Sequence, residues 1–81
     1  MSEIKVYGTA WCPDCRRAKQ ILDARRVAFT WIDIDGDAAA MSYVQSVNGG
    51  FRSVPTIVFP DGSVLVEPAS SELEKKLAEL G

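Results

Sequence analysis

The sequence predicts one small α/β domain, residues 1–81, in which a four-stranded mixed sheet carries helices on both faces. Three observations support this prediction. The chain has 81 residues, of which 47% are hydrophobic and 25% charged, a composition that suits a compact domain with a true core. Short runs of β-branched and aromatic residues alternate with longer runs of helical spacing. Gly and Pro residues separate these runs, and no repeat or linker interrupts them.

The N-terminal third predicts a strand, a helix and a second strand. Glu3–Tyr7 is a short β-type run that Gly8 ends. A helix is expected over Pro13–Arg26, because proline suits a first helical turn and apolar residues then recur at helical spacing. Val27–Ile34 has the composition of a buried strand. Since a helix connects the two strands, they should lie parallel, with a right-handed crossover.

The middle of the chain predicts a second helix and then a hairpin. Asp37 can cap a helix over Asp37–Val47, and Asn48–Gly50 can end it with Asn or Gly in the left-handed conformation. Thr56–Phe59 and Ser63–Glu67 have strand composition. Pro60-Asp61-Gly62 between them is a strong turn signal, so these two strands should pair antiparallel.

The C-terminal segment predicts a last helix. Pro68 ends the preceding strand, and Ser70 or Ser71 can cap a helix that ends near Leu80. Glu74 follows Ser71 at the spacing of a capping box. The expected element order is therefore β-α-β-α-β-β-α. Three leucines at helical spacing should form the buried stripe of this helix, namely Leu73, Leu77 and Leu80.

The charge pattern argues against nucleic acid as a partner, since the net charge is −2. The basic residues are nevertheless uneven. Five of the nine lie within one short stretch, either as a positive field beside an anionic group or as a solvated helix face. They are Arg16, Arg17, Lys19, Arg25 and Arg26.

The sequence also bears on the compartment. No apolar run approaches the ~20 residues needed to span a bilayer, so no membrane partner is expected. The N-terminal MSEIK lacks the features of a signal peptide, which favours a cytoplasmic, reducing setting. In that setting a structural disulfide is uncommon and a reactive cysteine pair is more plausible.

Cys12 and Cys15 are the candidate catalytic residues, because they lie where a strand gives way to a helix. Unpaired N–H groups and the helix dipole at a helix N-terminus stabilise a thiolate, which is the form that attacks disulfides. Cys12, at the helix edge, should be the attacking sulfur. Cys15, one turn inside on the apolar face, should resolve the mixed disulfide that Cys12 forms.

Other interpretations of the pair remain open. A disulfide across two intervening residues closes so short a loop that it would stabilise the fold little. A structural zinc needs four ligands, whereas the chain has two cysteines and no histidine, so a metal or iron–sulfur site would need a second chain or carboxylates. An inert pair is the third alternative. Asp14 would oppose a thiolate at Cys12, whereas Arg16 and Arg17 would favour one, and an acidic residue here also suits a first helical turn.

Three stretches resemble a known family. They are Trp11–Cys15 (WCPDC), Val47–Thr56 (VNGGFRSVPT), and Asp61–Ser63 (DGS) followed by Pro68–Ser70 (PAS). Over essentially its whole length the sequence resembles the glutaredoxin branch of the thioredoxin superfamily, and within that branch the mycoredoxins. The resemblance implies the thioredoxin-like (glutaredoxin) fold.

The resemblance also implies an activity. A mycoredoxin or glutaredoxin reduces protein disulfides and mixed disulfides, with a low-molecular-weight thiol (mycothiol, bacillithiol or glutathione) as co-substrate and no bound cofactor or metal. Its partners are disulfide-bearing or S-thiolated proteins, and we expect a monomer. The run Gly50–Ser53 also resembles redoxins that supply electrons to ribonucleotide reductase and are reduced by thioredoxin reductase, which is the alternative function.

The resemblance places further residues at the substrate. Pro55 should be cis and face the cysteines, so that the backbone of Val54 pairs with the cysteinyl part of a bound thiol or peptide. By itself, Pro55 could also be an ordinary residue at the start of a strand. Trp11 should shield the edge of the pair or pack on the first strand, and Arg52 should hold an anionic ligand or lie solvated in its loop. Pro13 and Asp14, between the cysteines, complete the predicted substrate contacts.

One departure concerns the segment Glu67–Ser71. Typical glutathione-using glutaredoxins have a Gly-Gly pair followed by Cys/Ser-Asp there, which holds the γ-glutamyl end of glutathione. Mycothiol has no γ-glutamyl group, so this departure favours a mycoredoxin. Asp14 also replaces the tyrosine of the commonest glutaredoxin motif. Among the other residues, Asp33 and Asp35 are expected to be solvated, and four aromatic side chains are assigned to the core or the sheet faces: Tyr7, Phe29, Trp31 and Phe59.

Overall fold

A computed structural model describes residues 3–80. The predicted order β-α-β-α-β-β-α is confirmed, with a short 3₁₀ turn (η1) added after the second strand. The elements are β1 (Ile4–Gly8), α1 (Pro13–Ala24), β2 (Phe29–Asp33), η1 (Ile34–Gly36), α2 (Ala38–Val47), β3 (Thr56–Val58), β4 (Val64–Val66) and α3 (Ser70–Leu80).

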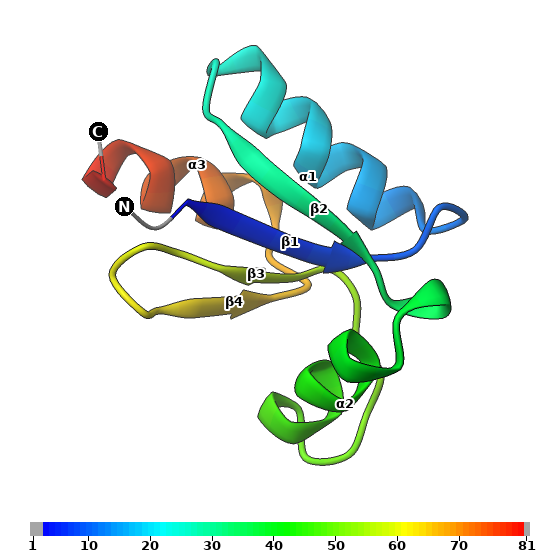
Figure 1. The fold of residues 1–81 in the computed structure, drawn as a ribbon. Helices are drawn as coiled ribbons and strands as arrows, with labels where there is room; N and C mark the ends of the chain where they lie inside the picture. The colour runs from blue at the N-terminus through cyan, green and yellow to red at the C-terminus, as the bar shows by residue number, and fades with distance from the viewer. Residues whose placement is uncertain (1–2, 81) are drawn as a thin grey trace.

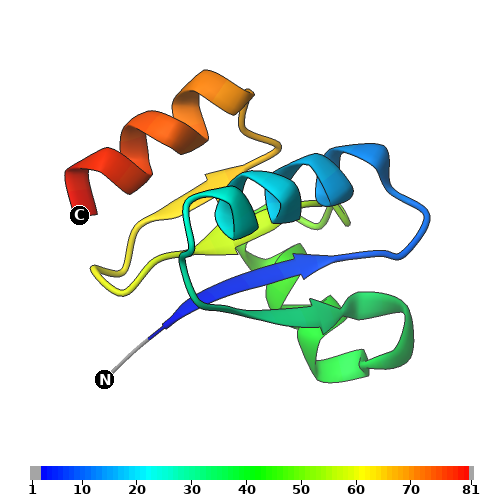
Figure 2. The same ribbon diagram turned by 90° about the horizontal axis from the view of Figure 1, so that it is seen from above.

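The strands form the predicted four-stranded mixed sheet, in the order β2-β1-β3-β4. β1 pairs parallel with β2, with Val6 opposite Trp31, and antiparallel with β3, with Val6 opposite Ile57. β3 and β4 form the antiparallel hairpin. Helices α1 and α3 lie on one face of the sheet and α2 lies on the other (Figures 1 and 2). This is the thioredoxin-like arrangement.

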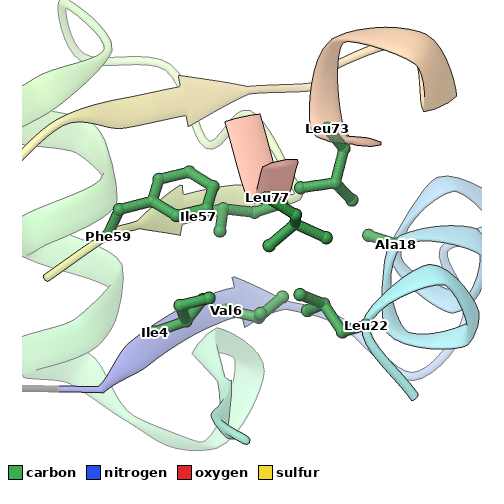
Figure 3. Packing of buried hydrophobic residues seen from close by; sticks show 8 residues of the cluster. All are labelled: Ile4, Val6, Ala18, Leu22, Ile57, Phe59, Leu73 and Leu77. Atoms are coloured by element: carbon green, nitrogen blue, oxygen red, sulfur yellow. The ribbon is translucent and has the colours of Figure 1, made fainter. Parts of the chain in front are cut away.

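The larger core lies between the sheet and helices α1 and α3. The alternation of β1 turns Ile4 and Val6 toward this side, where they meet Leu22 of α1 and Ile57 of β3. Figure 3 shows these side chains pointing toward one another from both strands and both helices. The remaining members are Ala18, Phe59, Leu73 and Leu77. The middle and last turns of α1 are thereby packed against the sheet, which fixes the helix that begins directly after Cys12.

A smaller core lies under α2. Ile34, Ala40 and Val44 are its buried members, and Tyr7 and Val54 pack against it from the sheet and the loop before β3. Tyr7 also lies against Tyr43, with ring centroids 5.0 Å apart. The expectation that Tyr7 belongs to a sheet face is confirmed.

The N-terminal boundaries differ from the sequence predictions. Gly8 is the last residue of β1, paired with Asp33, whereas the sequence suggested that it ends the strand. α1 ends at Ala24, two residues before the predicted end, because Arg26 adopts a positive φ of 56°. β2 covers only the middle of Val27–Ile34, since Ile34 turns into η1.

The second helix and the hairpin follow the predicted signals closely. The Asp37 side chain caps α2 by accepting a hydrogen bond from the Ala40 N–H at 3.0 Å. Gly49 and Gly50 follow that helix with φ values of 63° and 96°, in the left-handed region expected there. In the hairpin, Gly62 N–H donates to the Phe59 carbonyl at 2.9 Å. The two strands are shorter than predicted, three residues each.

The last helix is capped differently from the prediction. The Ala69 carbonyl accepts the first helical hydrogen bond, from Leu73 N–H at 3.1 Å, so Ala69 and not Ser70 or Ser71 is the N-cap residue. Glu72 reaches back to the Ala69 N–H at 2.9 Å, which is the carboxylate half of a capping box two residues earlier than expected. Glu74 instead pairs with Arg25 at 3.5 Å.

The buried stripe of α3 is shorter than predicted. Leu73 and Leu77 are buried, but Leu80 is 39% exposed because the last turn extends past the sheet. None of the helices in residues 3–80 is both long enough and apolar enough to cross a bilayer.

Candidate functional site

Cys12 is the N-cap residue of α1, and its sulfur takes the place of a capping oxygen. Its backbone is extended, with φ −86° and ψ 116°, as an N-cap requires. Sγ accepts a hydrogen bond from the Cys15 N–H at 3.2 Å, and the Cys12 N–H donates to the Thr9 carbonyl at 3.3 Å. Proline at the next position lacks an N–H, so it leaves no extra donor unpaired there. An N–H group is therefore aimed at the sulfur that the sequence predicts to be the nucleophile.

Cys15 has different surroundings. It lies in the first turn of α1 with no exposed surface, and both cysteines are free thiols. Burial, together with a hydrogen bond with Cys12, raises the pKa of Cys15 from 9.0 to about 12, while the Thr9 backbone partly opposes this rise. Cys15 is therefore a neutral thiol at physiological pH. Cys12 also has little exposed surface, 6%.

The loop before β3 lies beside Cys12. The Val54–Pro55 peptide bond is cis, as the resemblance implied. The Cys12 thiol lies 3.9 Å from the Val54 carbonyl oxygen, so the backbone of this loop and the sulfur share one surface. The loop is held from behind, because the Thr56 hydroxyl donates to the Ser53 carbonyl at 2.8 Å. The Pro55 carbonyl accepts from the Glu67 N–H at 2.9 Å.

A cavity of about 310 Å³ opens beside this surface. Trp11 and Val54, which flank Cys12, contribute to its lining, and so does Arg52. The structure thus brings together Cys12 and three of the predicted substrate-binding residues. The other lining residues are Thr9, Ile34, Asp35 and Met41.

The Trp11 side chain is exposed to solvent and does not pack on the first strand. Its side chain is 67% exposed, and its indole N–H donates to Asp35 Oδ2 at 3.1 Å. Asp35 belongs to η1, whose first turn is stabilised by Asp33 Oδ1 accepting from the Asp35 N–H at 2.9 Å. The sequence predicted two solvated carboxylates here. Both are exposed, but each makes a specific hydrogen bond, and Asp35 forms part of the cavity wall.

Pro13 and Asp14 lie on the outer surface of the first turn. Pro13 is exposed and Asp14 is half-buried. The Asp14 carboxylate pairs with Arg17 at 3.3 Å, so its charge is partly balanced within the helix. Neither residue lines the cavity.

Three of the five basic residues of this stretch contact other parts of the protein. Arg17 also donates to the Pro68 carbonyl at 3.4 Å, and Arg25 pairs with Glu74. Lys19 lies over the Trp31 ring, 4.1 Å from its centroid. These contacts favour the interpretation of the basic stretch as a helix face over that of a free positive field.

Thr9 is a residue that the sequence analysis missed. Its side chain is 3% exposed, and its hydroxyl oxygen has no hydrogen-bond partner among residues 3–80. Buried polar groups are almost always paired, so an orphan hydroxyl beside a cavity marks a place where a bound group could hydrogen-bond. Its position in the loop before the nucleophile was a usable signal. Within residues 3–80, no three His, Cys, Asp or Glu side chains cluster as metal ligands.

Comparisons with known proteins agree with this geometry. The sequence profile of the glutaredoxin family matches residues 4–65. A Mycobacterium tuberculosis protein described as a glutaredoxin is 44% identical over 77 residues, which cover 95% of this chain and 92% of that protein. The chain belongs to the glutaredoxin family. Mycoredoxin 1 of Corynebacterium glutamicum is 39% identical to this glutaredoxin over 80 residues, 99% of each chain.

Solved structures of related proteins have the same fold as this glutaredoxin. A thioredoxin-like protein is 32% identical, with a TM-score of 0.81 over 93% of this chain and 99% of the other. A glutaredoxin from Archaeoglobus fulgidus is 28% identical, with a TM-score of 0.80 over 95% of this chain and 87% of the other. The protein is thus a glutaredoxin- or mycoredoxin-type redox protein with a Cys12–Cys15 pair.

Proposed function

We propose that this glutaredoxin reduces protein disulfides and mixed disulfides between proteins and a small thiol. The Cys12 thiolate attacks one sulfur of the substrate disulfide, forms a mixed disulfide and releases the other sulfur as a thiol. Cys15 can then attack Cys12 Sγ, which forms the Cys12–Cys15 disulfide and releases the remaining half as a thiol. Alternatively, a second small thiol attacks the sulfur of the small thiol bound to Cys12, which forms the small-thiol disulfide and releases Cys12. When Cys15 attacks, its proton goes to the leaving sulfur, and the pair is oxidised by two electrons while the substrate is reduced by two.

The observation that carries this proposal is the unlike placement of the two sulfurs. Cys12 Sγ caps a helix and lies beside the Val54 carbonyl and a cavity, whereas Cys15 is a fully buried thiol one turn behind it. At the helix N-terminus the Cys15 N–H donates to the first of these sulfurs. The backbone of Val54 offers a substrate main chain a partner next to the reacting sulfur.

The cavity supports a small thiol as co-substrate. A ligand whose cysteinyl part lies alongside Cys12 and Val54 would extend toward Trp11 and Arg52. The unpaired Thr9 hydroxyl would then gain a partner, and leaving such a group unpaired costs about 1–3 kcal/mol. Asp35 adds an acceptor, so the cavity suits a group that bears hydroxyls or amides.

Mycothiol is our first choice for this thiol. The segment Glu67–Ser71 lacks the Gly-Gly and Cys/Ser-Asp residues associated with the γ-glutamyl group of glutathione. Similarity to a mycoredoxin over 99% of the chain points the same way. Bacillithiol and glutathione remain the alternatives to test.

The deciding experiment measures NADPH consumption with this protein as the limiting redox carrier. One reaction contains mycothiol and its reductase, and a second contains thioredoxin reductase, each with the same mixed-disulfide substrate. Parallel reactions replace mycothiol by bacillithiol or glutathione with the matching reductase. Turnover with mycothiol alone supports the proposal. Turnover with thioredoxin reductase alone would identify a redoxin that supplies ribonucleotide reductase.

Two variants test the roles of the cysteines in the same assay. Cys12→Ser should lose all turnover, because no other thiol lies at the surface beside Val54. Cys15→Ser should keep reduction of the small-thiol mixed disulfide, which needs one sulfur, and should lose thiol-independent reduction of a protein disulfide. Equal activity of Cys12→Ser and the wild type would overturn the assignment.

The remaining expectations belong to the same proposal: a monomer in the cytoplasm whose partners are S-thiolated or disulfide-bearing proteins. A dimer bridging an iron–sulfur cluster is the competing interpretation. Freshly purified protein should show no visible absorption band and should elute as a monomer. A coloured dimer would instead support the cluster-binding interpretation.

A further inference from the structure

Gly8 is required for steric reasons, because the end of β1 has no room for a side chain. A Cβ atom added there would lie 2.6 Å from Cys15 Sγ and 2.6 Å from Cη2 of Trp31. The backbone itself does not demand glycine, since Gly8 is absent from the residues with positive φ in the described chain. Gly36 provides a contrast, because a Cβ there would meet nothing within 4 Å.

The place at the end of β1 where Cys15 Sγ and the Trp31 ring both lie close to Gly8 is named here the Cys15 slot. Its walls cannot easily give way. Gly8 is held in the sheet by pairing with Asp33, and Trp31 packs against the larger core from β2. Lys19, one helical turn beyond Cys15, covers the same ring at 4.1 Å. The slot is therefore bounded by the backbone of β1 and by the side chains of Cys15 and Trp31, of which the Trp31 ring is held by the larger core and by Lys19.

The contact belongs to the dithiol form of the protein, in which both cysteines are free. Oxidation joins the two sulfurs in a covalent bond, far shorter than any non-bonded contact, while the two thiols lose two electrons and two protons to the substrate disulfide. At least one of the two sulfurs must change position to reach that distance. The contact of Cys15 Sγ with Gly8 described here is the one made in the dithiol form.

We propose that the Cys15 slot stabilises the dithiol form relative to the disulfide form, so that Gly8 and Trp31 help to set the reduction potential of the pair. Both are positioning residues, because they act through Cys15 and do not touch the substrate. This inference rests on the proposed function, since it assumes that the pair cycles between the two forms. A more stable dithiol form makes a disulfide more oxidising.

The test is the reduction potential of Gly8→Ala. The protein is equilibrated in dithiothreitol redox buffers, and its oxidised fraction is read from the mass added by thiol alkylation. The new methyl group displaces Cys15 Sγ in the dithiol form. We therefore expect the equilibrium between the dithiol and disulfide forms to shift about tenfold toward the disulfide. For a two-electron couple this is a potential ~30 mV more negative. Gly36→Ala, the matched control, should stay within twofold of the wild type.

Trp31→Phe tests the other wall. The smaller ring of phenylalanine removes the atoms beside Gly8, so the dithiol form loses packing. The equilibrium between the two forms should then shift about threefold toward the disulfide. In the double variant the added methyl has room, and the shift should be smaller than that of Gly8→Ala alone. This non-additivity would show that the residues share one slot.

A merely structural role for Gly8 would lower the thermal midpoints of the reduced and oxidised proteins equally and leave the potential unchanged. That result, or a shift toward a more oxidising potential, would overturn the inference. If Gly8→Ala does not fold, Trp31→Phe carries the test, and an unchanged potential would overturn it. The measurement needs neither a small biological thiol nor a protein substrate, so its failure is distinct from failure of the NADPH assay.

Discussion

Cys12 and Cys15 lie one helical turn apart, yet the fold gives them opposite surroundings. Cys12 Sγ accepts a backbone N–H at 3.2 Å and lies beside the Val54 carbonyl. Cys15 lies behind it, in contact with the sheet, with its pKa raised to about 12 chiefly by burial. At the scale of single residues, this asymmetry is the reason that we propose Cys12 as the attacking sulfur and Cys15 as the resolving one.

The pKa of Cys15 predicts how stability depends on pH in the reduced protein. The unfolded chain loses this proton near the ordinary value of 9.0, whereas the folded protein keeps it up to about pH 12. Between these values the folded state binds more protons, so the stabilisation that is complete below pH 9 is lost as pH rises toward 12. The urea midpoint should therefore decrease more from pH 7 to pH 10 in the wild type than in Cys15→Ala.

Tyr7 has a raised pKa as well, from burial and from the nearby Tyr43 and Asp37. It is present in both proteins of this comparison, so its contribution to the pH dependence cancels. Parallel pH curves for the wild type and Cys15→Ala would contradict the prediction.

The three α-helices differ in the residue that caps the N-terminus. In α1 the cap is Cys12, the proposed nucleophile, and in α2 it is Asp37. The N-cap of α3 is Ala69, which has no side-chain acceptor. Glu72, which reaches back to the Ala69 N–H, supplies the side-chain hydrogen bond at this terminus. The first N–H groups of α3 are consequently less well satisfied than those of the other helices.

Ala69→Ser should stabilise the protein by about 1 kcal/mol, because an N-cap hydroxyl satisfies a free N–H of the first turn. Urea unfolding at neutral pH measures the change. Ser71→Ala serves as the control. Since Ser71 is not the cap, its loss should change the free energy of unfolding by less than about 0.5 kcal/mol. A large decrease of the free energy of unfolding in Ser71→Ala would instead support the capping box predicted from the sequence.

At the scale of the whole molecule, one core supports the site. The sheet face that receives α1 also receives α3, and Leu22 of α1 lies at the centre with no exposed surface. A chain of this length has roughly 4–12 kcal/mol of stability in total, at ~0.05–0.15 kcal/mol per residue. Packing that holds α1 on the sheet therefore also holds the cysteine pair in place.

Leu22→Ala should lower the free energy of unfolding by about 2–5 kcal/mol, because it leaves a cavity at a fully buried position. Leu80→Ala is the matched control in α3. The Leu80 side chain is 39% exposed, so its truncation should cost less than about 1 kcal/mol. Similar losses in the two variants would contradict the packing described for the larger core.

The sequence by itself determined the element order, the fold class, the cysteine pair and the caps and turns whose partners lie within a few residues. Asp37, Gly49–Gly50 and the Asp61-Gly62 turn are of this kind, because local hydrogen bonds and backbone preferences decide them. The family resemblance added the cis bond before Pro55, which no local signal required. Boundaries were wrong mainly where a strand or helix competed with a turn, as at Ile34 and Arg26.

Only the tertiary structure decided the contacts between distant segments. Asp35 meets Trp11 across 24 residues, Thr9 is buried without a partner beside a cavity, and Gly8 has two neighbours that come from α1 and β2. Leu80 has the helical spacing of a buried residue but is exposed, because the sheet does not extend beneath it. Such features depend on which surfaces meet when the elements pack, and periodicity along the chain does not contain that information.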